Sequence, residues 1–450
     1  MILQELIGKK IVIWGLGKEA KSIVQYLHNQ APNQNLTIIN DGRPNSATLE
    51  QFSQYGPITF RFEHDVHDIL SSADVVIKSP GISSYRPEIE HAKSKGIIFT
   101  TPTNIWFAEK AESLTVVVTG SNGKSTTAAL LASFLEHAGL SVGFGGNIGI
   151  PLLDLINHRN QSFDIWVVEL SSYQICDMDF SPDVGVLLNL YPEHVQWHGT
   201  IEQYYSDKLK LFQYSHCVPI LNFNDKVTKE LCQVLPNPLY FNSRSSFHVE
   251  NDRVLDRSEP IISLNEIRLK GTHNLSNICA ALTVLRHLDI NIRESISVLT
   301  QFEGLPYRLQ ILGERDTILF VNDSISTSPE AALAAVEAFP ERPLTILLGG
   351  QDRQQNYKDL AQRVCKKPVV GIVTMHETGP YIAKEINLVK QHSKIFPILK
   401  ESRDLFDAIA VAKEITPKDG LILLSPAAPS YDAFKNYQER GDIFSRLAGF

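Results

Sequence analysis

The chain has 450 residues, of which 43% are hydrophobic and 20% are charged. This composition is typical of a folded globular protein, and the length predicts two or three domains. A formal net charge of −8 argues against a nucleic-acid or anionic-membrane surface as the main partner. The cysteines are scattered without a C-x-x-C pair, which favours a reducing compartment and disfavours a thiolate zinc site. No leader pattern and no long apolar stretch occurs, so we expect a cytoplasmic protein.

Residues 1–106 alternate between strand-like and helix-like patterns. Strands are predicted at 10–14, 36–40 and 74–78, and an amphipathic helix at 18–28, which together indicate a small parallel sheet. Gly15-Leu-Gly17-Lys-Glu-Ala20 follows the first strand and is close to G-x-G-x-x-A, and Asp41 has the spacing of a ribose contact. By itself this pattern fits NAD, another nucleotide, or a structural turn. The segment at 102–111 is expected to connect to the next domain.

The second block, residues 107–304, opens with the most informative stretch of the chain. A β-branched run ends in Gly120-Ser-Asn-Gly123-Lys124-Ser125-Thr126, after which a helical pattern continues to residue 137. This order is typical of a nucleoside-triphosphate cradle. Backbone N–H groups and a helix N-terminus receive the phosphates, the lysine neutralises their charge, and a hydroxyl reaches Mg²⁺. The common pattern G-x-x-x-x-G-K-[ST] has a glycine where this chain has Val118, so the cradle is a shorter variant.

The rest of the second block predicts further α/β structure. In chain order we expect a loop at 143–149, strands at 163–168, 184–189 and 217–221, a helix at 201–212, short strands and loops at 236–270, and a helix at 274–287. Glu169 follows one of these strands, where functional residues gather in α/β sheets. From its position alone, Glu169 could hold the Mg²⁺ of the cradle or cap a helix.

His194 also follows a predicted strand and is a candidate metal ligand. Together with His198 it has the spacing of a metal pair on a helix, but Pro192 and Gly199 favour a loop. We therefore expect His194 to be the ligand and His198 to pack or form hydrogen bonds. Lys208 lies in a helical stretch beside a second lysine, and its sequence context alone indicates only a solvated side chain.

Residues 305–450 repeat the α/β alternation. Strands are predicted at 317–322, 344–348, 369–374 and 421–424, and a helix at 328–338. Polar groups follow three of these strands and indicate the rim of a crevice. Asp323 suits an adenosine ribose, whereas Arg353, Ser430 and Lys435 suit a small substrate that bears carboxylates. The fold class is α/β, with domains predicted at 1–106, 107–304 and 305–450.

A series of motifs across essentially the whole chain resembles the Mur ligases, the ATP-dependent amino-acid ligases of peptidoglycan precursor synthesis. The motifs are the short cradle, Val168-Glu169-Leu-Ser-Ser, His194, Gly271-Thr-His273-Asn274-x-x-Asn277 and Gly304-Leu-Pro-Tyr-Arg308. Two further motifs narrow the resemblance to the MurD-type branch, which adds glutamate to UDP-N-acetylmuramoyl-L-alanine. These are Asn322-Asp323-Ser324 and Leu424-Ser-Pro-Ala-Ala-Pro-Ser430-Tyr-Asp-Ala-Phe-Lys435-Asn-Tyr437. The implied fold has Rossmann-like first and third domains and a P-loop ATPase-like second domain, and we expect a monomer.

The resemblance implies a reaction. ATP phosphorylates the alanyl carboxylate of the UDP-sugar, the amino group of glutamate attacks the acyl phosphate, and a tetrahedral intermediate collapses to the amide. Two Mg²⁺ ions are implied, the first held by Ser125 and Glu169 and the second by His194 and Lys208. In this assignment Lys208 is a carbamate (an N-carboxylated lysine), which turns a cationic side chain into the oxygen ligand that Mg²⁺ prefers. Lys124, Glu169, His194 and Lys208 are the implied catalytic residues.

The resemblance also assigns binding residues by position. For ATP they are Gly120, Ser121, Asn122, Gly123, Lys124, Ser125, Thr126, His273, Asn274, Asn277, Arg308 and Asp323. For the UDP-substrate they are Gly15, Leu16, Gly17, Asp41, Gly42, Arg43, Gly81 and Asn147. For glutamate they are Thr327, Arg353, Ser430 and Tyr437. With this assignment, the G-x-G-x-x-A pattern does not indicate NAD.

Two departures from the family pattern bear on the amino acid. The family's Asp-Ser-Lys-x-Thr is here Asp323-Ser-Ile325-Ser-Thr327, and the first strand ends in Ile13-Trp14. Both features resemble a variant subgroup that adds L-glutamate. The family base rate favours D-glutamate, with L-glutamate as the alternative.

Three other functions compete with this hypothesis. They are a folylpolyglutamate synthase-type ligase, a nucleotide-binding regulator without catalysis, and a dehydrogenase.

Overall fold

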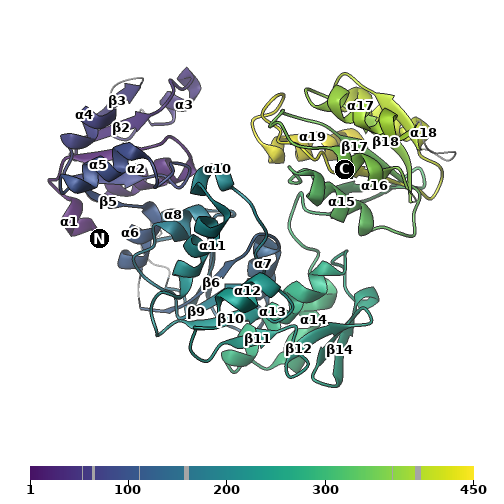
Figure 1. Cartoon of the computed structure of the whole chain (residues 1–450), viewed down its shortest axis with the longest axis horizontal. Coiled ribbons are helices and arrows are strands. Elements are labelled where there is room, and N and C mark those ends of the chain that lie inside the picture. The colour runs from purple at the N-terminus through teal and green to yellow at the C-terminus, as the bar shows by residue number, and fades with distance from the viewer. Residues whose placement is uncertain (53, 63–65, 111, 157–161, 367, 391–396) are drawn as a thin grey trace. The chain divides into compact units, whose positions relative to one another are not determined.

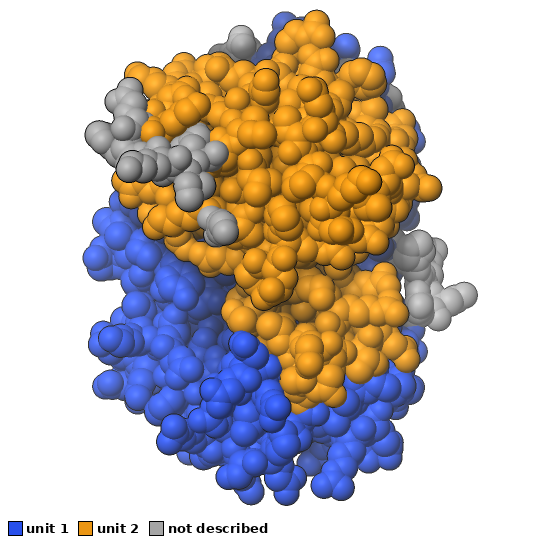
Figure 2. All heavy atoms as spheres, turned by 90° about the vertical axis from the view of Figure 1, so that its right-hand side faces the viewer, with its two compact units in different colours: residues 1–261, 276–298 blue, residues 262–275, 299–450 orange. Residues whose placement is uncertain are grey.

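The structure of the chain is a computed structural model (Figure 1). It describes residues 1–52, 54–62, 66–110, 112–156, 162–366, 368–390 and 397–450. The chain forms two compact units, residues 1–261 with 276–298 and residues 262–275 with 299–450, which Figure 2 shows in two colours. Among the described helices, none has the length and apolar character needed to span a membrane. The division into three domains at 1–106, 107–304 and 305–450 stays a prediction.

The first unit begins with a parallel sheet of five strands in the order β3-β2-β1-β4-β5. Its strands are β1 (Ile11–Trp14), β2 (Leu36–Asn40), β3 (Ile58–Phe62), β4 (Val75–Lys78) and β5 (Ile98–Thr100). The helices around it are α1 (Leu3–Leu6), α2 (Lys18–Gln30), α3 (Ser46–Glu50), α4 (Val66–Ser71) and α5 (Pro87–Ser94). The predicted parallel sheet is confirmed. The unpredicted strands β3 and β5 are its two edges, which are only partly buried and therefore carry a weaker apolar pattern.

The second sheet of this unit has six parallel strands in the order β11-β10-β9-β6-β8-β7. They are β6 (Leu114–Thr119), β7 (Val142–Gly146), β8 (Ile165–Glu169), β9 (Val184–Leu187), β10 (Val218–Asn222) and β11 (Leu239–Phe241). The helices are α6 (Pro102–Glu109), α7 (Lys124–His137), α8 (Leu152–Ile156), α9 (Ser172–Cys176), α10 (Val195–His198), α11 (Ile201–Leu209) with the 3₁₀ turn η1 (Lys210–Phe212), and α12 (Lys226–Leu231).

The predicted loop at 143–149 is wrong in its first half, because residues 142–146 form strand β7. Its glycines reflect close packing rather than a turn. A Cβ atom at Gly143 would lie 2.2 Å from the ring of Trp166 on the neighbouring strand β8. Only glycine therefore allows this strand to pair beside a large indole.

The segment at 102–111 contributes to the core and is not merely a connection. Its helix α6 buries Trp106 completely, and the ring of Trp106 meets that of Trp166 edge-on at 4.9 Å between centroids. One buried cluster contains residues of both sheets, among them Ile13 of β1 and Val117 of β6. The segment leads from β5 to β6, as a connection would, and its helix was not predicted because the apolar residues of α6 surround the helix rather than forming one stripe.

A small antiparallel sheet and two helices follow. They are β12 (Phe247–Glu250), β13 (Arg253–Asp256) and β14 (Glu259–Ser263), with η2 (Leu264–Glu266), α13 (His273–His287) and α14 (Ile292–Gln301). Short strands were predicted at 236–270 and a helix at 274–287, and both predictions are confirmed.

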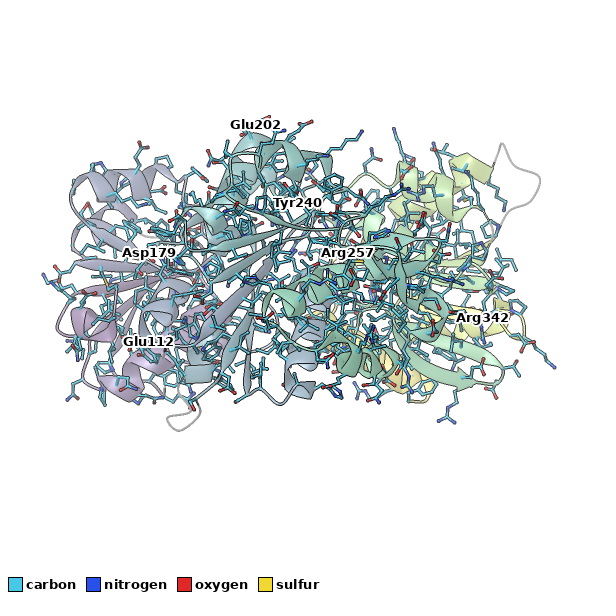
Figure 3. The ribbon with its side chains drawn as sticks, turned by 90° about the horizontal axis from the view of Figure 1, so that it is seen from below. Glu112, Asp179, Glu202, Tyr240, Arg257 and Arg342 are labelled. Carbon is cyan, nitrogen blue, oxygen red and sulfur yellow. The ribbon has the colours of Figure 1, made fainter. Side chains whose placement is uncertain are left out.

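Charged side chains such as Glu112, Asp179 and Glu202 are exposed on the outside of the first unit (Figure 3).

The second unit contains a six-stranded sheet in the order β15-β16-β20-β17-β18-β19, in which only β15 is antiparallel to its neighbour. The strands are β15 (Gln310–Arg315), β16 (Ile318–Asn322), β17 (Leu344–Leu348), β18 (Val369–Thr374), β19 (Ile398–Glu401) and β20 (Leu421–Leu424). The helices are α15 (Pro329–Glu337), α16 (Lys358–Val364), α17 (Gly379–Lys390), α18 (Leu405–Ile415) and α19 (Tyr437–Ala448). The predicted start of α15 is confirmed, since the Ser328 hydroxyl accepts a hydrogen bond from Ala331 N.

Candidate active site

The glycine turn between β6 and α7 forms the predicted cradle. Gly123 precedes α7 with φ +85°, and a Cβ atom there would lie 2.4 Å from the Asn277 side-chain oxygen. Lys124 is the first residue of the helix, and its Nζ donates a hydrogen bond to Ser121 O over 2.7 Å. The lysine and the helix N-terminus thus lie at one end of the parallel sheet, as phosphate binding requires. Asn277, assigned to ATP from sequence, lies against this turn.

Glu169 lies beside the cradle because β8 pairs directly with β6. Its side chain is 1% exposed, and it accepts hydrogen bonds from Ser125 Oγ at 2.6 Å and from Asn147 Nδ2 at 2.9 Å. A buried carboxylate next to the helix hydroxyl is the donor set that a phosphate-bridging Mg²⁺ uses. The residues therefore fit the ion that the family implies. Asn147, expected near the sugar–peptide part of the substrate, joins the same cluster.

Lys208 is 2% exposed, so its sequence context as a solvated lysine was misleading. Its Nζ donates to Gly120 O over 2.9 Å and faces the cradle from α11. Burial lowers the pKa of this amine well below its usual value, and the charge of Lys124 lowers it further. Among the described residues Lys208 takes part in no ion pair. The charges of Glu193 and Glu169 act in the opposite direction. A buried lysine whose pKa is strongly shifted and which lines a cavity is a candidate for a chemical role.

His194 faces the same region from the residue before α10. It adopts a left-handed backbone conformation with φ +55°, which is unusual for a residue other than glycine. Burial lowers the pKa of His194 to about 4, and the charges of Lys124 and Lys208 act in the same direction. The imidazole is therefore neutral at pH 7, with a nitrogen lone pair available to a metal ion.

These residues surround a cavity of about 240 Å³ in the first unit. Its lining residues are Gly120, Lys124, Asn147, Ser171, Ser172, Tyr173, Glu193, His194 and Lys208. Glu193 and Tyr173 were not predicted. Glu193 directly precedes His194, and Tyr173 follows Glu169 by four residues. This proximity in sequence is the signal that could have identified them.

His198 is buried and hydrogen bonded, as predicted from sequence. Its Nδ1 lies 2.6 Å from Asp207 Oδ2, and its Nε2 lies 3.0 Å from Ser172 Oγ. Asp207 also accepts a hydrogen bond from Tyr85 OH at 2.7 Å. In the described part of the chain no three His, Cys, Asp or Glu residues are arranged to hold a metal ion. A metal site here accordingly needs Ser125, substrate phosphates or a modified lysine as further ligands.

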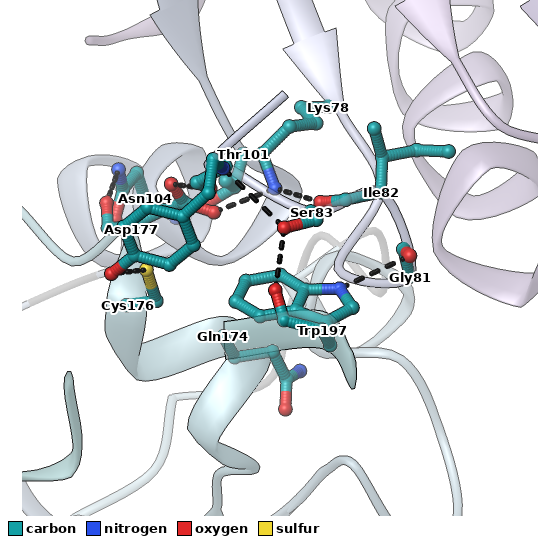
Figure 4. A network of polar contacts seen from close by, with 12 residues as sticks. Lys78, Gly81, Ile82, Ser83, Thr101, Asn104, Gln174, Cys176, Asp177 and Trp197 are labelled. Atoms are coloured by element: carbon teal, nitrogen blue, oxygen red, sulfur yellow. Dashed lines mark hydrogen bonds and ion pairs between the residues drawn. The ribbon is translucent and has the colours of Figure 1, made fainter. Parts of the chain in front are cut away.

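The loop after β4, which contains the candidate UDP residue Gly81, is held against α9 and α10 (Figure 4). Lys78 forms an ion pair with Asp177 at 2.8 Å, and the Trp197 indole donates to Gly81 O over 3.1 Å. Ser83 Oγ donates to Trp197 O over 2.6 Å. These contacts connect the first sheet to the segments around α9 and α10, which lie beside the cavity of the second sheet. Both sheets belong to the first unit.

The remaining UDP-substrate candidates lie at the ends of β1 and β2. Gly15 has φ +116°, and a Cβ atom there would lie 2.5 Å from Ser79 Oγ, so a side chain is excluded. Asp41 follows β2 and pairs with Arg86 at 2.6 Å, and the Arg86 guanidinium lies over the Trp14 ring at 4.7 Å. Arg86 was not predicted. The other four candidates, Leu16, Gly17, Gly42 and Arg43, follow these same two strands.

Three of the ATP candidates cluster in the second unit. Asp323 is 3% exposed and accepts hydrogen bonds from Leu309 N at 3.0 Å and from Ser425 Oγ at 2.7 Å. Burial raises the pKa of Asp323 to about 6. Burial lowers the pKa of His273, and the charge of Arg308 lowers it further. The charge of Arg308 also opposes the rise in the pKa of Asp323, so Arg308 lies within electrostatic reach of both side chains.

The glutamate candidates follow the ends of β16, β17 and β20, as predicted. Thr327 O accepts a hydrogen bond from Gln355 Nε2 at 3.0 Å, and Tyr437 O accepts one from Ser324 Oγ at 2.8 Å. Ser430 is buried, whereas Arg353 and Lys435 are exposed.

Comparisons with known proteins agree with this geometry. Residues 118–285 match the model of the Mur ligase middle domain, and residues 9–100 match that of the Mur ligase MurD-like N-terminal domain. The chain is 38% identical to the UDP-N-acetylmuramoyl-L-alanine--L-glutamate ligase of Xylella fastidiosa (strain Temecula1), over 100% of this chain and 97% of that protein. A protein of the same name from a Micromonospora strain is 32% identical over 99% of this chain and 97% of that protein.

Solved structures share the fold. The UDP-N-acetylmuramate-alanine ligase MurC of Thermotoga maritima superposes with a TM-score of 0.60 at 17% identity, covering 97% of this chain and 98% of that one. The MurF ligase of the same organism, in complex with ADP, gives a TM-score of 0.59 at 17% identity, covering 97% of each chain. The family models and the curated relatives show that the chain is an ATP-dependent ligase. The chain belongs to the Mur ligase family.

Proposed function

We propose that this enzyme joins glutamate to UDP-N-acetylmuramoyl-L-alanine with hydrolysis of ATP to ADP and phosphate. The observation that carries the proposal is the 38% identity, over the full chain, to a ligase named for this reaction. The cavity bounded by Lys124, His194 and Lys208 supports it, because an acyl phosphate needs cations and metal ligands around one small volume.

The amino acid is the finer part of the proposal. The family base rate alone favours D-glutamate, whereas the relatives at 32% and 38% identity are named for L-glutamate. We therefore propose L-glutamate as the substrate and keep D-glutamate as the alternative that the assay tests.

The residues of the cavity have separate roles in the proposed reaction. Lys124 and the N-terminus of α7 bind the triphosphate and offset the charge that develops as the phosphoryl group moves to the substrate carboxylate. The amino group of glutamate then attacks the acyl carbon, phosphate leaves, and the amide bond forms. Asn147 holds Glu169 in place through its 2.9 Å hydrogen bond.

Mg²⁺ would be held by Ser125 and Glu169 at a first site and by His194 and Lys208 at a second. When bound, it would neutralise charge on the phosphate oxygens. The second site requires Lys208 to carry a carbamate. Burial favours the uncharged amine of Lys208, and that is the form which reacts with CO₂. The neutral imidazole of His194 supports the same proposal.

An ADP-release assay with UDP-N-acetylmuramoyl-L-alanine tests the function. D-glutamate and L-glutamate are supplied in separate reactions, with a reaction lacking any amino acid as the control. We expect release of ADP with one enantiomer and formation of the corresponding amide product. ADP release that is independent of glutamate would contradict the proposal and favour a nucleotide-binding regulator.

The other candidate functions have less support. The MurD-like match at 9–100 supports a UDP-binding first domain, which a folylpolyglutamate synthase-type ligase lacks. The same match argues against a dehydrogenase, and an unchanged nicotinamide fluorescence on mixing is the expected result. A monomeric state and a cytoplasmic location remain part of the proposal.

A further inference from the structure

Arg440, in the first turn of α19, carries a buried charge, and the proposed reaction assigns no role to it. The residue is 0% exposed. Its Nε donates to Ser324 Oγ over 3.1 Å, and Nη2 donates to Ser324 O over 2.8 Å. Its Nη1 donates to the carbonyl oxygens of Ala428 at 3.1 Å and Pro429 at 3.3 Å. All of these acceptors are neutral oxygens.

Because none of these acceptors carries a negative charge, the positive charge of the guanidinium is not neutralised by its hydrogen-bond partners. In the part of the chain that the structure describes, Arg440 takes part in no ion pair. Burial lowers the pKa of Arg440 to about 10, and the charge of Asp432 acts in the opposite direction. The group is still protonated at pH 7. A buried cation without an anionic partner is unfavourable by itself, so an anionic ligand nearby would offset its burial.

The position of Arg440 connects this charge with the proposed glutamate site. Its hydrogen bonds join the loop after β16 to the loop after β20. A third loop, after β17, passes closely, since a Cβ atom at Gly350 would lie 3.0 Å from Arg440 Nη1 and 2.2 Å from Pro429 O. Gln351 N donates to Pro429 O over 2.8 Å. These three loops contain the glutamate candidates Thr327, Arg353 and Ser430.

We propose that Arg440 is a specificity-determining residue of the amino-acid site, which holds the three loops together and whose unpaired charge favours a dicarboxylate. The inference rests on the proposed function. Because Arg440 is buried, it acts as a positioning residue and through its electrostatic field, without touching the substrate. A field in a protein interior is screened less than one in water, so a charge several ångströms away still discriminates between a carboxylate and an amide.

The test compares glutamate with glutamine, which has the same shape but lacks the second negative charge. The variants are Arg440→Gln, which removes the charge, and Arg440→Lys, which keeps it but loses the planar fork. The KM for glutamate and the inhibition constant of glutamine as its competitor are measured at saturating ATP and UDP-substrate. We expect Arg440→Gln to reduce the preference for glutamate about tenfold, and Arg440→Lys to retain most of it.

A purely structural role predicts a different result. Arg440→Gln would then weaken glutamate and glutamine equally, and that outcome overturns the inference. An inactive wild-type enzyme in the glutamate assay would instead overturn the proposed function. The two failures are thus distinguishable.

A second variant does not disturb the buried group. Asp432 is exposed, and Asp432→Asn removes the negative charge that offsets Arg440. We expect a lower KM for glutamate, by about twofold to threefold, with the KM values for ATP and the UDP-substrate unchanged. An unchanged or higher KM for glutamate in this folded variant contradicts the inference, whatever the stability of the Arg440 variants.

Discussion

Lys124 and Lys208 differ from the other lysines of the chain in what surrounds them. Both line the cavity at the cradle, and Lys208 is buried there. The sequence placed Lys124 through its motif. It left Lys208 indistinguishable from a surface lysine except by family resemblance, because burial depends on residues far away along the chain.

Replacing either lysine removes a charge or a ligand from the reacting groups. We expect Lys124→Ala and Lys208→Ala each to lower kcat by at least about a hundredfold while leaving the fold intact. The measurements are ADP release and far-UV circular dichroism, with the exposed Lys226→Ala as the matched control. Normal turnover of Lys208→Ala would falsify the carbamate assignment. Activity of the wild type that falls when CO₂ is depleted and returns with bicarbonate supports it.

Asp323 makes the stability of the second unit depend on pH. Its folded pKa of about 6 lies above the usual value of 3.8, so the folded state binds the proton more tightly than the unfolded state. The contribution of Asp323 to stability is therefore greatest at low pH and is lost as the pH rises from about 4 through about 6. We expect the wild type to lose up to about 3 kcal/mol relative to Asp323→Asn between pH 4 and pH 7. Urea unfolding at several pH values measures this difference, and parallel pH profiles of the two proteins would contradict it.

At the scale of elements, central strands were predicted well because both of their faces are buried and their apolar runs are continuous. Strand β7 was missed because its glycines resemble a loop in sequence. A glycine is needed at position 143 because the Trp166 ring lies on the neighbouring strand β8. Only the order of strands in the sheet brings these two residues into contact.

A methyl group at this position should therefore destabilise the sheet. We expect Gly143→Ala to lower the free energy of unfolding by about 1–3 kcal/mol, since the added carbon overlaps the indole. The double variant Gly143→Ala/Trp166→Leu tests the cause, because the smaller side chain relieves the overlap. Losses that simply add in urea unfolding would show that the Trp166 contact is not responsible.

At the scale of the whole molecule, the first two sheets share one buried cluster, and Trp106 lies within it. The sheet of the second unit has two buried clusters of its own, whose fully buried members lie between Ile318 and Ala448. The predicted boundary at residue 106 thus separates two sheets but cuts through a common core.

Isolated fragments should behave accordingly. We expect residues 305–450 to unfold cooperatively in urea with α/β circular dichroism, because both buried clusters of the sheet lie within these residues. Residues 1–110 should not, because Trp106 and its neighbours would lose their partners in the second sheet. Residues 1–261, which retain both sheets but lack 276–298, provide the comparison. A cooperative transition of 1–110 alone would contradict the shared core.

The sequence by itself determined the α/β class, the nucleotide cradle at 120–126 and the family, because these follow from local patterns of a few adjacent residues. The strand ends that carry Glu169, His194 and Asp323 were also readable, since parallel strands place their carboxyl ends at one edge. Only the tertiary structure decided that Lys208 and Arg440 are buried and that Trp106 joins two sheets. Whether a side chain is buried, and whether its charge has a partner, depends on neighbours that are distant in sequence. A local sequence pattern therefore does not predict either property.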